Sequence, residues 1–149
     1  MALPSDPDAL ARDLDAALPD DGGLVLFDGA LEADALAAAD ALAQRRSLRL
    51  HRVHAADLLH DRFGAVRGNL REVFDEAHAA SLLLLTEADA LLTASPALDD
   101  DDPEGPPASV RLRRYLLDRT AAFEGIVALA VASVAPYDDL RSHAVVVPR

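Results

Sequence analysis

SLLLLT, residues 81–86, is an apolar run of six residues that lies between two helical patterns. Its four consecutive leucines leave no polar position on either side of a strand, so other parts of the chain must cover both faces. IVALAVA at 126–132 and LVLFD at 24–28 have the same continuous apolar character. Such runs are typical of parallel strands that are buried between two layers of helices.

Strands and helical patterns alternate on both sides of this run. LRLHRV at 48–53 and HAVVVP at 143–148 complete the expected strands. Helices are expected at 6–18, 31–44, 66–80, 87–94 and 110–123, with a short helix and loop at 54–64 and a polar loop at 95–109. The alternation predicts an α/β fold, a three-layer αβα sandwich with a parallel sheet of about five strands. Ser5 or Asp6 is expected to cap the first helix.

The carboxyl ends of the expected strands are the candidate site, because ligands of open α/β sheets bind beyond those ends. These ends are Asp28-Gly29, Val53-His54, Thr86-Glu87 and Ala132-Ser133.

The composition indicates one folded, cytoplasmic domain. The chain has 149 residues, 51% of them hydrophobic. It has no cysteine, which excludes disulfides, thiolate metal sites and thiol nucleophiles. No apolar run approaches the ~18 residues of a membrane span. The first residues, MALPSDPDAL, lack the basic and apolar regions of a signal peptide.

The charge of the chain is strongly negative. There are 26 acidic residues, 20 of them Asp, and 14 basic residues that are all Arg, which gives a net charge of -12. Such a charge argues against nucleic acid and anionic membranes as partners. The Asp excess without Lys indicates a salt-rich, halophile-like cytoplasm, where the Debye length falls to about 3 Å at 1 M salt. A GC-rich genome would also favour Arg, but it explains the Asp excess less well.

Residues 58–92, LLHDRFGAVRGNLREVFDEAHAASLLLLTEADALL, resemble the central stretch of the AAA-type P-loop ATPases. In that family, an aromatic or aliphatic residue and Gly lead into a helix of the form N-[LV]-R-x-[VI]-F-D-x-A. A strand that ends in the Walker B acids follows. Phe63-Gly64 and residues 69–77 match this pattern without gaps. YLLDR at 115–119 and the strand at 126–132 resemble the next helix and the sensor 1 strand.

The resemblance implies one large AAA subdomain with a P-loop NTPase-like fold. It covers residues 23–149, preceded by an N-terminal helical lead-in at 1–22. The small helical lid of the family is expected to be absent, because the chain stops at Arg149.

The positions that hold phosphate in this family are changed here. The family's P-loop, G-x-x-x-x-G-K-[ST], cradles phosphates with backbone N–H groups and a Lys, and its hydroxyl binds Mg²⁺. With Gly29 as the first Gly, Asp34 replaces the second. Ala35 then replaces the Lys and Leu36 replaces the hydroxyl residue, while a shift by one residue would put Asp34 at the Lys position. Glu32 and Asp34 would repel a triphosphate.

The Walker B and sensor 1 positions are altered as well. Thr86 stands where the family has the Asp that holds Mg²⁺, whereas Glu87 matches the Glu that activates the attacking water. Glu87 is either that general base or an acid that favours a helix N-terminus. Asp89 matches the last acid of the motif or is a solvated helix residue. Ala132 or Ser133 falls at the sensor 1 position, which is usually Asn.

The ring-forming features of the family are only partly kept. Arg141 is nearest to the arginine finger, which acts on a neighbour's nucleotide, and is otherwise a surface arginine. Arg62 stands where the family has a pore-loop aromatic, and the following Phe63 is a partner contact or a core residue.

Two other groups of residues are not expected to form sites. The histidines lack the spacing of metal ligands; they are His51, His54, His60, His78 and His143. The run Asp99–Asp102 is expected to be a solvated loop.

The changed positions predict a degenerate AAA-type domain that is deficient in ATP hydrolysis and needs no cofactor. Its expected partner is a protein, either an active AAA ATPase or its client. The alternative is a divergent ATPase that binds ATP and Mg²⁺ through Gly29 and the helix N-terminus, with Glu87 as its base. A gene remnant without a role is a third possibility.

Overall fold

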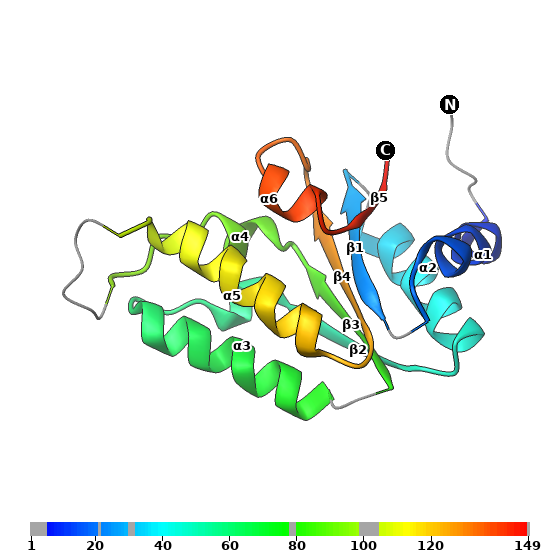
Figure 1. Cartoon of the computed structure of the whole chain (residues 1–149), viewed down its shortest axis with the longest axis horizontal. Coiled ribbons are helices and arrows are strands. Elements are labelled where there is room, and N and C mark those ends of the chain that lie inside the picture. The colour runs from blue at the N-terminus through cyan, green and yellow to red at the C-terminus, as the bar shows by residue number, and fades with distance from the viewer. Residues whose placement is uncertain (1–5, 21, 30–31, 78–79, 99–104, 149) are drawn as a thin grey trace.

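All five strands run parallel in one sheet, in the order β2-β3-β4-β1-β5 (Figure 1). The computed structural model describes residues 6–20, 22–29, 32–77, 80–98 and 105–148. The strands are β1 (Gly23–Asp28), β2 (Arg49–His54), β3 (Ser81–Thr86), β4 (Ile126–Val131) and β5 (Val145–Val147). The expected α/β fold with a parallel sheet is confirmed.

Helices cover both faces of the sheet. They are α1 (Pro7–Ala17), α2 (Glu32–Arg45), the 3-10 helix η1 (Ala55–Leu58), α3 (Phe63–Ala77), α4 (Asp89–Leu92), α5 (Ala108–Ala122) and α6 (Asp138–Arg141). Helices α3 and α5 lie side by side over one face, whereas α1 and α2 cover the other (Figure 1).

The leucines of β3 explain why the sheet needs two covering layers. Every residue of β3 and of β4 is buried. Leu83 and Leu85 pack into the core beneath α3 and α5, while Leu82 and Leu84 pack into the core beneath α1 and α2. The four leucines therefore divide between two hydrophobic cores, as alternation along a strand requires.

Most elements differ from the expected ranges by one or two residues at an end, and three larger differences have a physical reason. Helix α3 begins at Phe63 rather than at residue 66, because the Phe63 side chain is buried in the core and starts the apolar face of the helix. The short helix α6 is not expected from the sequence, since four residues carry too little periodicity. Strand β5 is limited to Val145–Val147, because His143 and Ala144 instead make backbone hydrogen bonds to α6.

The first helix has the expected cap. The Asp6 carboxylate accepts a hydrogen bond from the Asp8 N–H at 3.0 Å. Ser5, the other candidate cap, lies outside the described residues, as do His78 and the run Asp99–Asp102.

Candidate functional site

The candidate site is the carboxyl edge of the sheet, where β1, β2, β3 and β4 end. The register pairs Asp28 of β1 with Val131 of β4, and His54 of β2 with Thr86 of β3. Four strand ends thus meet at one edge, and the segments that follow them supply the exposed polar groups.

The turn from β1 to α2 is short. Strand β1 ends at Asp28 and α2 begins at Glu32, so three residues connect them. Gly29 has a φ of 68°, a left-handed conformation that favours Gly, and its N–H donates to the Val131 carbonyl at 2.8 Å. A loop that wraps a phosphate through residue 34 would need those residues outside the helix. Here Glu32 and Asp34 form the first helical turn.

The positions of the Lys and the hydroxyl face inward. Ala35 is fully buried between α2 and the sheet, and Leu36 packs partly against the same core. Glu32 and Asp34 are exposed. Two carboxylates at a helix N-terminus interact favourably with its dipole, but they repel phosphate.

A histidine joins the two residues at the Walker B position. His54 Nε2 lies 3.2 Å from Glu87 Oε2, and His54 Nδ1 lies 3.0 Å from Thr86 Oγ1. If the Nε2–H of a neutral ring donates to Glu87, its Nδ1 can accept from the Thr86 hydroxyl. Glu87 holds a φ of 51°, an uncommon conformation for a residue with a side chain.

The direction of this contact matters for chemistry. His54 ends β2, which lies on the opposite side of β3 from β4 and β1. The Glu87 carboxylate is therefore held on the side of β3 that faces away from the β1–α2 turn. The sequence places His54 at a strand end of the candidate site, but nothing in its spacing shows that it pairs with a residue 32 positions later.

Two more carboxylates of this edge, those of Asp28 and Asp89, hold the segment after β4. Asp89 accepts a hydrogen bond from the Ala132 N–H at 2.6 Å and one from the Tyr137 hydroxyl at 2.5 Å. The Val134 N–H donates to Asp28 at 3.2 Å. Burial and the bond to Asp89 raise the pKa of the Tyr137 hydroxyl above its usual range. Asp89 is thus an internal hydrogen-bond acceptor rather than a freely solvated helix residue.

The remaining candidate residues lie apart from these contacts. The Ser133 hydroxyl accepts from the Ala135 N–H at 3.2 Å, a local turn contact. Arg141 pairs with Asp138 one turn earlier in α6, at 2.9 Å. The side chain of Phe63 lies in the core, as one of its two expected roles requires, and Arg62 is exposed.

The donor set does not fit Mg²⁺ in the way that the resemblance implies. Thr86 is 1% exposed and its hydroxyl contacts His54, while both oxygens of Asp89 already accept hydrogen bonds. Within the described residues, no three His, Asp or Glu side chains come together as a metal site would require. The residues present therefore do not form the Mg²⁺ site of the family.

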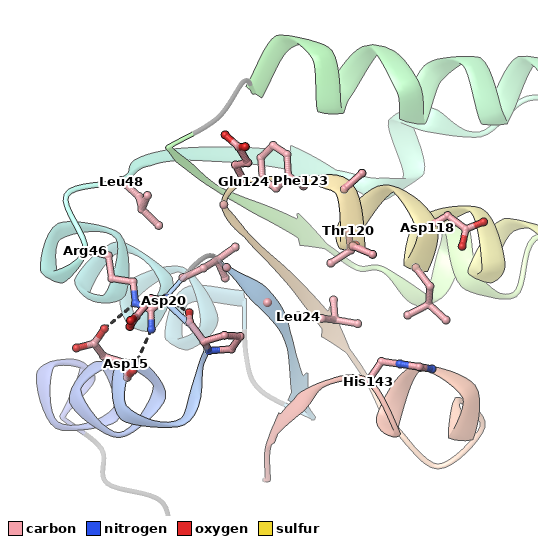
Figure 2. A pocket seen from close by; sticks show the side chains of 18 of the residues that line it. Asp15, Asp20, Leu24, Arg46, Leu48, Asp118, Thr120, Phe123, Glu124 and His143 are labelled. Atoms are coloured by element: carbon pink, nitrogen blue, oxygen red, sulfur yellow. Dashed lines mark hydrogen bonds and ion pairs between the residues drawn. The ribbon is translucent and has the colours of Figure 1, made fainter.

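A large groove lies at the opposite, amino edge of the sheet. It has a volume of about 1260 Å³ and extends from the end of α1 to the end of α5 (Figure 2). Arg46, on one of its walls, donates to Asp15 at 2.6 Å and to the backbone carbonyls of Asp15, Leu18 and Pro19. Arg46, and then Arg45, hold the pKa of Asp15 below its usual value. This arginine joins α1 to α2 and is satisfied by doing so.

The comparisons with known proteins support the resemblance. The model of the ATPase family associated with various cellular activities (AAA) matches residues 37–143. A search of the curated proteins finds no match. Among the described residues, no helix has both the length and the apolar composition that crossing a membrane requires.

Proposed function

Because this chain belongs to the AAA family of ATPases, we propose that it is a member deficient in ATP hydrolysis. Its work is assembly or regulation, through a protein partner that is an active family member or that member's client. It needs no nucleotide or metal for this role.

The contact between His54 and Glu87 carries the proposal. A general base must reach the proton that it removes. Glu87, the residue at the position of the family's base, is instead engaged by a histidine on the side away from the β1–α2 turn. Thr86 at the metal-binding position is buried and lacks a carboxylate.

The charges at the β1–α2 turn support the same conclusion. Two like charges about 4 Å apart repel by about 1 kcal/mol in water and by about 4 kcal/mol near a protein surface. The helix N-terminus attracts an anion by only about 0.3–1 kcal/mol. Glu32 and Asp34 therefore outweigh the helix dipole for a triphosphate at this turn.

A protein partner is supported by what the chain retains. The five-stranded sheet and both covering layers are formed, although the positions that would hold phosphate and Mg²⁺ are changed. A complete fold presents a stable surface to a partner without any chemistry of its own.

Titration calorimetry of the full chain with Mg-ATP at high salt tests the loss of nucleotide binding. We expect no binding heat up to millimolar nucleotide. Micromolar binding, or phosphate release that Glu87→Gln abolishes, would contradict the proposal and favour the divergent ATPase. A pull-down at multimolar salt tests the partner, and we expect an intact AAA protein to co-purify with the chain.

A further inference from the structure

A pocket between α3 and α5 collects positive charge on this acidic protein. We call it the α3–α5 pocket, and it has a volume of about 450 Å³. Its lining residues are Gly64, Arg67, Gly68, Arg71 and Tyr115. Arg67 and Arg71 are four residues apart on α3 and thus lie on one face of the helix. The lining contains no carboxylate, although acidic residues outnumber arginines in the chain by 26 to 14.

The two arginines lack the ion pairs that some other arginines make, such as those of Arg46 and Arg113. In the part of the chain that the structure describes, neither Arg67 nor Arg71 has an acidic partner. Arg67 instead stacks over the Phe63 ring, 5.5 Å from its centre. Asp75 has the spacing to pair with Arg71, but its carboxylate bonds Arg119 of α5 at 3.1 Å. The Arg71 guanidinium is therefore left available.

The glycines and the tyrosine shape the pocket. Gly68 leaves open space above the helix, since a Cβ there would meet nothing within 4 Å. A Gly inside a helix costs roughly 0.5–1 kcal/mol relative to Ala, and this helix carries two of them at the pocket. Tyr115 contributes a hydroxyl that has no hydrogen-bond partner among the described residues. The pocket thus combines room, two guanidinium groups and one free hydroxyl.

We propose that the α3–α5 pocket binds the carboxylate side chains of an acidic segment of the protein partner. This proposal rests on the proposed function, which supplies the partner. Guanidinium groups recognise carboxylates through paired N–H donors, and a phenol can add one more donor. An acidic segment is favoured over a free oxyanion because several linked carboxylates engage both arginines at once. A single small ion in so open a pocket would have to overcome the net charge of -12 with fewer contacts.

An NMR titration of the full chain in 1 M KCl with a capped tetra-aspartate peptide tests this assignment. We expect saturable shifts of the Gly68 and Arg71 amides and of the amides around Tyr115. Arg71→Gln should weaken binding at least fivefold, and Arg67→Gln similarly. Both side chains are exposed, so the variants should keep the fold, which their amide spectra check. Arg52→Gln, which removes an exposed arginine of β2, is the matched control and should change the affinity less than twofold.

Inorganic phosphate supplies the second arm of the experiment. It should bind more weakly than the peptide; equal or tighter binding would overturn the acidic segment and leave a site for free oxyanions. An absence of shifts, or an equal loss in Arg52→Gln, would overturn the pocket itself. No nucleotide is present in these titrations, so their failure leaves the proposed function standing. Conversely, Mg-ATP binding would overturn that function without moving the peptide result.

Discussion

The two tyrosines of the chain stand in regions that treat their polar groups in opposite ways. At the carboxyl edge, the Tyr137 hydroxyl is buried and bonds Asp89. In the α3–α5 pocket, the Tyr115 hydroxyl has no partner among the described residues, and neither arginine beside it has an acidic one. At the edge that the family uses for chemistry, the carboxylates of Glu87 and Asp89 have partners within the chain. The two arginines of the pocket are exposed and have no acidic partner among the described residues. The comparison therefore favours the pocket over the carboxyl edge as the place of the proposed partner contact.

The largest effect is expected when the family's P-loop lysine is restored at the carboxyl edge of the sheet. Ala35→Lys should lower the free energy of unfolding by at least about 3 kcal/mol, because Ala35 is fully buried and the new ammonium group would lose its hydration. Ala37→Lys, at an exposed position of the same helix, should change it by less than about 0.5 kcal/mol. Denaturant unfolding measures both. A stable Ala35→Lys variant that binds ATP would show that the carboxyl edge can still hold a nucleotide.

The two tyrosines can be compared directly. Tyr137→Phe removes a hydrogen bond to a carboxylate and should cost about 1.5–3 kcal/mol, whereas Tyr115→Phe should cost less than about 0.5 kcal/mol. Urea unfolding of both variants under identical salt gives the difference. Equal losses would mean that Tyr115 has a partner comparable to Asp89.

Removing His54 tests whether its contact with Glu87 is what prevents ATP hydrolysis. His54→Ala leaves the buried Thr86 hydroxyl without its partner and should cost about 1–2 kcal/mol. It should not produce phosphate release from Mg-ATP, because the β1–α2 turn still carries Glu32 and Asp34. Activity in His54→Ala that Glu87→Gln removes would show that Glu87 is a base held in reserve. His51→Ala, on the same strand, is the control.

The smallest effect concerns the ion pair of Arg46 with Asp15, which serves as the reference for the two pocket arginines without an acidic partner. The pKa of Asp15 is lowered by Arg46 and Arg45, so the unfolded chain takes up this proton first as the pH falls. The contribution of Asp15 to the free energy of unfolding is thus fully present above about pH 4 and is lost at lower pH. Asp15→Asn should flatten the acid side of the stability curve in this range. Asp13→Asn, at an exposed position of α1, should leave the curve unchanged.

The fold could be predicted from local patterns, but the contacts at the site could not. The bounds of β3 match the expected run 81–86. Four consecutive leucines in a strand are buried only when both faces of that strand are covered. The roles of His54 and Tyr137 depend on which strand ends and loops meet across the sheet, and residue spacing does not contain this information. In the sequence, Arg71 is only one residue of a family motif, because its lack of an acidic partner arises from the pairing of Asp75 with a different helix.

The early start of α2 has an evolutionary consequence. With only three residues between β1 and the helix, exchanging single side chains cannot rebuild a phosphate cradle, because the replaced positions already belong to the helix and its packed face. A revertant would need to unwind the first turn of α2 as well as exchange its side chains. A loss that includes a change of backbone conformation is harder to undo than the loss of a side chain alone.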